Sequence, residues 1–149
     1  MTFAWLRAKA LVIKSIRAGS VDVLRNGLTV SEGGKTPLEI VLALDGVQIE
    51  GVGLNKDDKP VAGATVVLAP EPAFRGRADR FDNCTTDQNG RYKFENVTPG
   101  DCKVFAWDDV EPGAWFDPDF FREIESRGRA VKLEAKGHES AQVHVLGAQ

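Results

Sequence analysis

The residues of this sequence that could do chemistry are few and scattered. Cys84 and Cys102 stand eighteen positions apart, a spacing that does not make a metal site. In an exported protein the two could form one disulfide, and otherwise they pack as small apolar side chains with free thiols. The sequence leaves both alternatives open.

The two histidines, His138 and His144, lie near the C-terminus, one in an expected turn and one in an expected strand. A role as base or ligand would need a nucleophile or a metal constellation, and neither is visible. We therefore interpret both as solvated or packed side chains. The sequence indicates no catalytic residue, no metal site and no cofactor, so we expect a protein that is not an enzyme.

Acidic residues gather in the loops 57–58 and 108–111, where calcium could use their oxygens. The segment 87–90 resembles the start of a calcium loop, but its ligand series stops there. We interpret these segments as turns whose Asp and Asn side chains bond their own backbone.

The loop 74–82 carries three arginines that could grip an anionic glycan or an acidic partner, namely Arg75, Arg77 and Arg80. The acids around it favour a solvated, internally balanced loop instead, namely Glu71, Asp79 and Asp82.

Exposed aromatic rings could stack on sugars, and the candidates are Trp5, Tyr92, Trp107 and Trp115. We select Trp115, beside a Pro-Gly pair, and Trp107 as the glycan-stacking candidates. Strand alternation places Cys102, Val104 and Ala106 on one face and Lys103, Phe105 and Trp107 on the other. We therefore expect Phe105 and Trp107 to form a second small core, and buried packing is also the commoner fate of a residue such as Trp115.

Short strands must position these residues. Apolar residues make up 42% of the 149-residue chain, which is enough for a packed core. Alternating apolar runs are separated by Gly, Pro, Asn and Asp, which is typical of a β-sandwich or barrel. We predict strands at residues 10–16, 21–24, 28–30, 38–42, 47–52, 64–68, 84–87, 91–94, 102–107, 130–134 and 141–146.

One helix is predicted after these central strands. Asp117 is a suitable N-cap and Pro118 suits the first helical position. Phe120, Phe121 and Ile124 share a face at helical spacing, which would cover the second core. Gly128 fits the end of the helix.

Charge and hydropathy limit the kinds of partner that this chain could bind. The net charge of -3 and the absence of a basic run argue against nucleic acid and an anionic membrane surface. No apolar stretch is long enough to insert into a bilayer. The N-terminus is a poor signal peptide, because Arg7 and Lys9 interrupt its apolar run. We expect a chain that begins upstream of residue 1 and belongs to an exported protein.

The Asp45-Gly46 turn is the predicted domain boundary. Residues 1–45 read as the C-terminal half of a preceding β-sandwich repeat, or as an N-terminal strand extension, and residues 46–149 as a complete sandwich. A half-sandwich would expose an apolar face and unpaired edges. It would have to pack on the second domain, pair with another chain, or complete itself with an upstream segment.

Residues 47 to about 107 resemble the carboxypeptidase regulatory-like domain. The matching segments, in order, are 49–52, 59–68 with Pro-Val-x-Gly-Ala-x-Val, 85–94 with Thr-Asp-x-x-Gly-x-Tyr-x-Phe, and 97–102 with Pro-Gly. The family usually has an aromatic residue where Cys102 stands. The tail from 105 to 115 looks like a variant found in series in large bacterial exported proteins.

The resemblance implies an all-β, immunoglobulin- or transthyretin-like antiparallel sandwich with one short helix after the penultimate strand group. It implies an accessory role, because family members are mostly spacers, folding aids or stalks, and it carries over no catalytic residue. We therefore expect a non-catalytic interaction or spacer module whose partners are neighbouring domains of its parent protein. A carbohydrate-binding module is the alternative, since some relatives by fold bind glycans.

Overall fold

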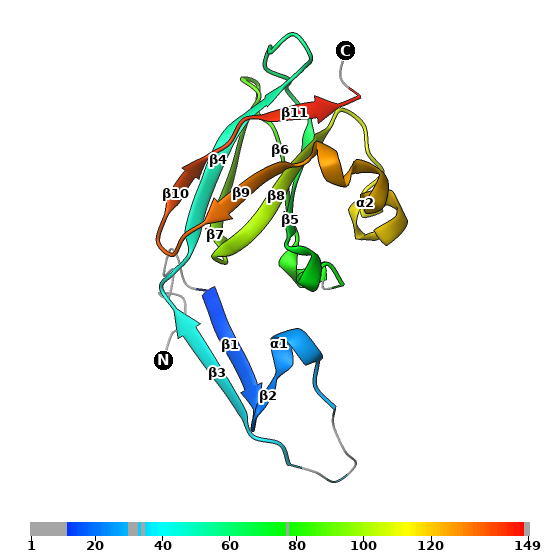
Figure 1. Ribbon diagram of the computed structural model, residues 1–149. Coiled ribbons are helices and arrows are strands. Elements are labelled where there is room, and N and C mark those ends of the chain that lie inside the picture. Colours follow the sequence, from blue (N-terminus) through cyan, green and yellow to red (C-terminus); the bar gives the residue numbers. More distant parts are fainter. Residues whose placement is uncertain (1–11, 30–32, 34, 77, 148–149) are drawn as a thin grey trace.

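The computed structural model describes residues 12–29, 33, 35–76 and 78–147, and these form an all-β sandwich as predicted (Figure 1). No helix among the described residues is long and apolar enough to cross a membrane. The strands are β1 (Val12–Ala18), β2 (Val21–Asp22), β3 (Leu38–Ala43), β4 (Val47–Leu54), β5 (Thr65–Pro70), β6 (Asp82–Thr85), β7 (Arg91–Val97), β8 (Gly100–Trp107), β9 (Arg129–Leu133), β10 (His138–Ser140) and β11 (Val143–Leu146).

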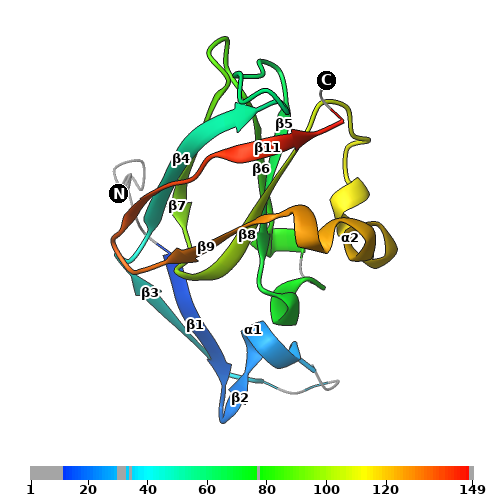
Figure 2. The ribbon, with the colours of Figure 1, turned by 45° about the horizontal axis from the view of Figure 1, so that its top comes forward.

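The first three strands form a small sheet of their own, in the order β2-β1-β3. We call the described part of residues 12–44 the N-terminal ribbon. It extends from one end of the sandwich in both views (Figures 1 and 2). Its strands pair antiparallel, with Ile16 opposite Ile40 and Ala18 opposite Leu38.

Within the ribbon, one strand prediction is correct only for Val21 and Asp22, and a second is wrong. The segment 21–24 continues from β2 into a one-turn helix, α1 (Val23–Asn26), because the Asp22 side chain accepts hydrogen bonds from the Leu24 and Arg25 N–H groups. This is an N-cap, and it outweighs the strand alternation of so short a segment. Of the predicted strand 28–30, Leu28 and Thr29 are irregular and Val30 lies outside the described residues.

The sandwich has two layers, closed by the C-terminal segment. One layer pairs β7, β4 and β10, and the other pairs β6, β5, β8 and β9. β10 and the start of β11 run parallel to β4, and the end of β11 then pairs in parallel with β8 (Figure 2). The C-terminal segment therefore joins both layers, and these parallel pairs are the exception to the antiparallel arrangement we predicted.

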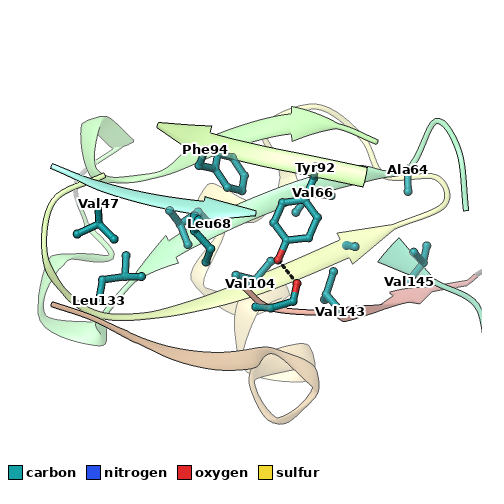
Figure 3. Close-up of a cluster of buried hydrophobic side chains, with 13 residues drawn as sticks. Val47, Ala64, Val66, Leu68, Tyr92, Phe94, Val104, Leu133, Val143 and Val145 are labelled. Carbon is teal, nitrogen blue, oxygen red and sulfur yellow. Dashed lines mark hydrogen bonds between the residues drawn. The ribbon is translucent and has the colours of Figure 1, made fainter. Parts of the chain in front are cut away.

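The main core lies between the two layers (Figure 3). Its thirteen buried residues include Val47 and Ile49 from β4, Val66 from β5 and Val104 from β8. The opposite face of β5 and β8 carries a second apolar cluster, made of Val67, Ala69, Phe105, Trp107, Trp115 and Phe121. β5 is therefore buried on both faces, which explains why residues 64–70 carry no charged side chain.

The predicted helix covers this second cluster. Helix α2 (Pro118–Ile124) begins where expected, and its N-cap Asp117 accepts a hydrogen bond from the Asp119 N–H. A 3-10 turn, η4 (Glu125–Arg127), follows it up to Gly128. Gly128 has extended backbone, and its lack of a side chain serves packing: a Cβ there would lie 2.5 Å from the Phe105 ring.

The crossing of the C-terminal segment over β4 has almost no free space. The Tyr92 hydroxyl donates a buried hydrogen bond to the Ala141 carbonyl (Figure 3). Burial raises the pKa of Tyr92, so the hydroxyl keeps its proton for this bond. A Cβ at Gly51 would lie 1.7 Å from the Ala141 oxygen and 2.8 Å from the Tyr92 hydroxyl. Glycine at position 51 is what lets the segment approach β4.

We expect Gly51→Ala to lower the free energy of unfolding by more than about 3 kcal/mol, because the clash is with backbone that must shift. Gly76→Ala is the matched control: a Cβ there meets nothing within 4 Å, so its effect should stay within about 0.5 kcal/mol. Urea unfolding followed by tryptophan fluorescence measures both. Equal stabilities for the two variants would contradict the described crossing.

Candidate functional site

A groove of about 550 Å³ lies beside helix α2. It lies between the loop that follows β5 and the segment that leads into α2. The loop contains the 3-10 turns η1 (Pro72–Phe74) and η2 (Ala78–Arg80), and the α2 side begins with η3 (Ala114–Phe116). We call it the aromatic groove, because four rings line it: Phe81, Trp115, Phe116 and Phe121.

Phe81 packs edge to face on two of the other rings, and Phe116 is the most exposed of the four. Phe81 contacts Phe116 and Phe121 with ring centroids 5.3 and 5.9 Å apart, and Trp115 lies 5.8 Å from Phe116. Phe116 is 46% exposed, whereas Trp115 and Phe121 are buried. The groove therefore presents the Phe116 ring beside buried aromatic side chains.

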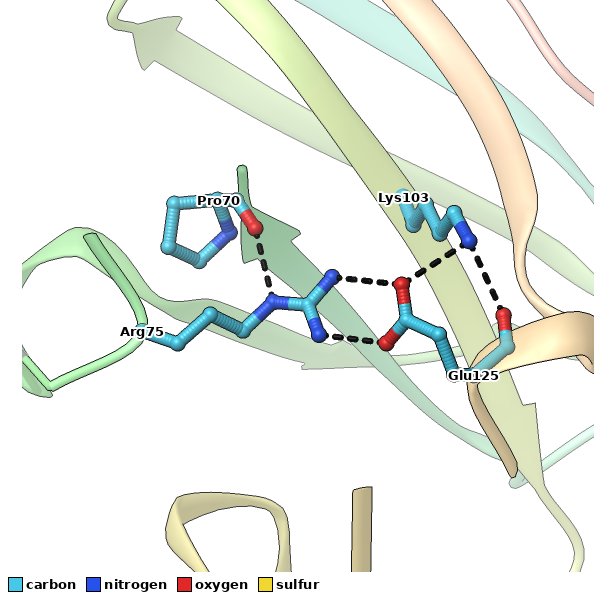
Figure 4. A network of polar contacts seen from close by, with 4 residues as sticks. All are labelled: Pro70, Arg75, Lys103 and Glu125. Carbon is cyan, nitrogen blue, oxygen red and sulfur yellow. Dashed lines mark hydrogen bonds and ion pairs between the residues drawn. The ribbon is translucent and has the colours of Figure 1, made fainter. Parts of the chain in front are cut away.

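An ion-pair network fixes the polar end of the groove (Figure 4). Both terminal nitrogens of the Arg75 guanidinium donate to the Glu125 carboxylate, and Arg75 Nε donates to the Pro70 carbonyl at 2.9 Å. Lys103 Nζ donates to Glu125 Oε1 at 2.9 Å and to the Glu125 carbonyl at 3.0 Å. The Arg75 guanidinium also lies 4.6 Å from the centre of the Phe121 ring.

The network holds Glu125 ionised. Hydrogen bonds from Arg75, and then from Lys103, lower the pKa of Glu125 to about 2 against the opposing effect of burial. A carboxylate with so low a pKa cannot act as a general acid or base near neutral pH. Its role is to tie the loop after β5 and strand β8 to the end of helix α2.

This network corrects our interpretation of the arginine loop as solvated. Arg75 is only 18% exposed in its side chain and has partners, because Glu125 lies opposite it in the fold. Arg80 stacks on the Phe74 ring with its guanidinium 4.6 Å from the centroid. Arg77 lies outside the described residues. We did not predict the roles of Glu125 and Lys103 from the sequence. The position of Glu125 at the end of the predicted helix was the one local indication of its role.

The structure buries both glycan-stacking candidates. Trp107 is 6% exposed and stacks on Phe105, with centroids 5.9 Å apart, and it also contacts Phe120. Our expectation of a second core containing Phe105 and Trp107 beneath the helix is confirmed. Trp115 is also 6% exposed and forms part of the groove wall. Burial removes the free ring faces that stacking on a sugar requires. Trp5 lies outside the described residues.

Cys84 and Cys102 are free thiols. They lie on the two strands that flank β5, opposite Val66 and Pro70 respectively. Strand geometry then separates them by about 16 Å, whereas a disulfide needs Cα atoms within about 7 Å. The fold therefore excludes the disulfide alternative. Burial raises the pKa of Cys102 to about 12, so this thiol is not a nucleophile at neutral pH.

The histidines and the acidic loops serve local contacts. His138 pairs with Glu50 at 3.0 Å and His144 with Asp58 at 2.9 Å, all with exposed side chains. The Asp87 carboxylate accepts hydrogen bonds from the Asn89 and Arg91 N–H groups, so this turn is closed by its own backbone, as predicted. Within the described residues, no group of three or more His, Cys, Asp or Glu side chains could hold a metal ion.

The sequence matches no family model and no curated protein. Among solved structures, a candidate carbohydrate-binding protein from Pseudomonas aeruginosa is 13% identical, with a TM-score of 0.47 over 67% of this chain and 88% of that one. The Bacillus anthracis TIE protein is 9% identical, with a TM-score of 0.45 over 74% of this chain. BcpA, the major pilin subunit of Bacillus cereus, is 13% identical, with a TM-score of 0.44 over 72% of this chain.

This chain spans only 19% of the length of the Bacillus anthracis protein and 31% of the pilin. These identities and TM-scores transfer no site residue and no ligand to this chain. Its membership of the carboxypeptidase regulatory-like family stays a prediction.

We expect Glu125→Gln to lower the free energy of unfolding at pH 7 by about 1–2 kcal/mol, a figure kept modest by solvent screening of a side chain that is 35% exposed. Glu123→Gln, on the exposed side of α2, is the control and should stay within about 0.5 kcal/mol.

The same prediction has a pH dependence. Because folding lowers the pKa of Glu125 from 4.5 to about 2, its contribution is present above pH 4.5 and is lost as the pH falls toward 2. Urea unfolding at several pH values should show a shallower acid decline for Glu125→Gln than for the unmodified chain. Parallel declines would mean that the network does not stabilise the fold.

Proposed function

We propose that this chain is a non-catalytic β-sandwich interaction module of an exported multidomain bacterial protein. Three groups of the sandwich take part in structural contacts: ion pairs hold Glu125 ionised, and burial holds Cys102 and Tyr92 neutral. An active site would instead need an acid or base whose pKa lies near the working pH. The sandwich thus supports a carrier role.

The observation that carries the proposal is the apolar surface of the N-terminal ribbon. Nine large apolar side chains are exposed in the described part of the chain, and eight of them belong to the ribbon. These eight are Ile13, Val21, Leu28, Leu38, Ile40, Val41, Leu42 and Leu44. A concentration of this kind on a protein whose sandwich is closed is typical of an interaction surface.

The domain division and the export of the parent protein belong to the same proposal. Both apolar clusters lie within residues 46–149, and no residue of the ribbon belongs to either cluster. This supports the proposal that residues 46–149 are a complete domain. Residues 1–45 would then be an extension or half-repeat whose apolar surface meets a partner. The segment order of the carboxypeptidase regulatory-like domain favours this setting, since such domains occur in series in exported bacterial proteins.

An apolar dye measures the proposed surface directly. At protein concentrations of about 1 μM or below, we expect bis-ANS fluorescence to rise with the native chain, and to fall at least about two-fold in the double variant Ile40→Lys, Leu42→Lys. The loss of fluorescence in Phe116→Ala measures the dye bound in the aromatic groove. We expect this loss to be smaller than the loss in the double variant. Dye binding that is unchanged in the double variant would contradict an open ribbon surface and with it the interaction module.

A carbohydrate-binding module is the second candidate, and the aromatic groove favours it. The open ring of Phe116 could take the stacking role that burial denies to Trp107 and Trp115. Charged side chains also line the groove, among them Arg122 and Asp117, and could bond sugar hydroxyls.

A glycan array probed with the purified chain tests this second candidate. If the groove binds a sugar, Phe116→Ala should abolish the signal, because the exposed ring face is lost, while Phe116→Tyr should keep it. An array without any bound glycan, or binding that survives Phe116→Ala, would count against this function.

A further inference from the structure

One face of the N-terminal ribbon consists of apolar side chains alone. Residues directly opposite each other in an antiparallel pair share a face. The pairs Ile13 with Leu42, Ile16 with Ile40, and Ala18 with Leu38 therefore lie on the same side. We call this side the apolar face, and its members are Ile13, Ile16, Ala18, Leu38, Ile40 and Leu42.

A β-bulge makes this face continuous. The register shifts between Ile13 and Ser15, so that Lys14 is the extra residue of β1. Without the bulge, Ile13 and Ile16 would alternate to opposite sides, because they are three positions apart. The bulge rotates Ile13 onto the side of Ile16, beside Leu42. The backbone geometry thus extends the apolar face along the whole of β1 and β3.

The other face of the same strands is mixed. It carries Arg17 opposite Glu39, Ser15 opposite Val41, and Val12 opposite Ala43. The two faces therefore differ as in a sheet with one face toward solvent and one toward a core. Yet the apolar face is exposed to solvent. Its exposed fractions are 45% at Ile13, 46% at Leu38, 55% at Ile40 and 53% at Leu42.

We propose that the apolar face docks against the apolar face of a second copy of this chain. A face with no charged member is complementary to itself, as a two-fold symmetric interface requires. Ile40 has Leu38 and Leu42 at equal spacing on either side. A two-fold axis beside Ile40 that crosses the strands sets Leu38 of one copy against Leu42 of the other and brings no charges together.

The area suits a dimer that forms reversibly. With Ile13, Leu38, Ile40 and Leu42 about half exposed, the apolar face offers roughly 450 Å² in each copy, or about 900 Å² for both, below the roughly 1,000 Å² that stable specific interfaces bury. We therefore expect weak association, and take a dissociation constant of about 1–100 μM as the range to search. This inference rests on the proposed interaction function and names its partner.

Sedimentation velocity of the full chain from about 1 to 500 μM tests the proposal, with a monomer–dimer transition in the micromolar range as the expected result. Ile40→Lys places a charge in the centre of the interface and should raise the dissociation constant by at least about 100-fold. Val41→Lys is the matched control. It adds the same charge one residue along β3 on the mixed face, and should change the dissociation constant by less than about 3-fold.

Tryptophan fluorescence and the urea midpoint of each variant verify that its sandwich still folds. A chain that stays monomeric up to 500 μM, or equal effects of Ile40→Lys and Val41→Lys, would overturn the dimer. The bis-ANS measurement separates the two failures. Dye bound at the ribbon of a monomeric chain would leave the interaction module standing with a different partner, whereas loss of both results would remove the proposed function as well.

Discussion

The burial of β5 on both faces is the constraint on which the rest of the sandwich depends. One face, with Val66 and Leu68, packs in the main core, and the other, with Val67 and Ala69, needs a second cover. Helix α2 supplies that cover, although seven residues are too few for a stable isolated helix. Its packing on the second cluster and the Arg75–Glu125 bond therefore hold it in place, and the aromatic groove is the seam that this arrangement leaves beside it.

Much of this arrangement could be predicted from local patterns. The apolar run of β5, the two faces of β8 and the Asp117 cap of α2 each depend on residues close together in the chain. The Arg75–Glu125 pair could not be predicted, because it joins residues fifty positions apart and either side chain alone looks like an ordinary surface charge. The parallel path of β10 and β11 could not be predicted from the sequence either. It depends on the space at Gly51, which in sequence resembles any strand glycine.

The packing of the sandwich also sets the protonation of three of its groups. The ion pairs around Glu125 favour its charged form, whereas burial favours the neutral forms of Cys102 and Tyr92. Each of these three groups therefore keeps one protonation state near neutral pH and serves a structural contact.

The ribbon, unlike the sandwich, has few buried side chains. The ribbon pairs two longer strands with the two-residue β2, and so small a sheet is marginally stable in water unless a face of it is covered. Among the side chains of β1 and β3, only Val12 is fully buried, and α1 meets the sandwich through Arg25, which lies 5.7 Å from the centre of the Phe74 ring. The sandwich therefore covers little of β1 and β3. In the proposed dimer, the second copy would cover Ile40 and its neighbours and so stabilise the paired strands. The sandwich has two apolar clusters of its own, whereas the cover of the ribbon would then depend on protein concentration.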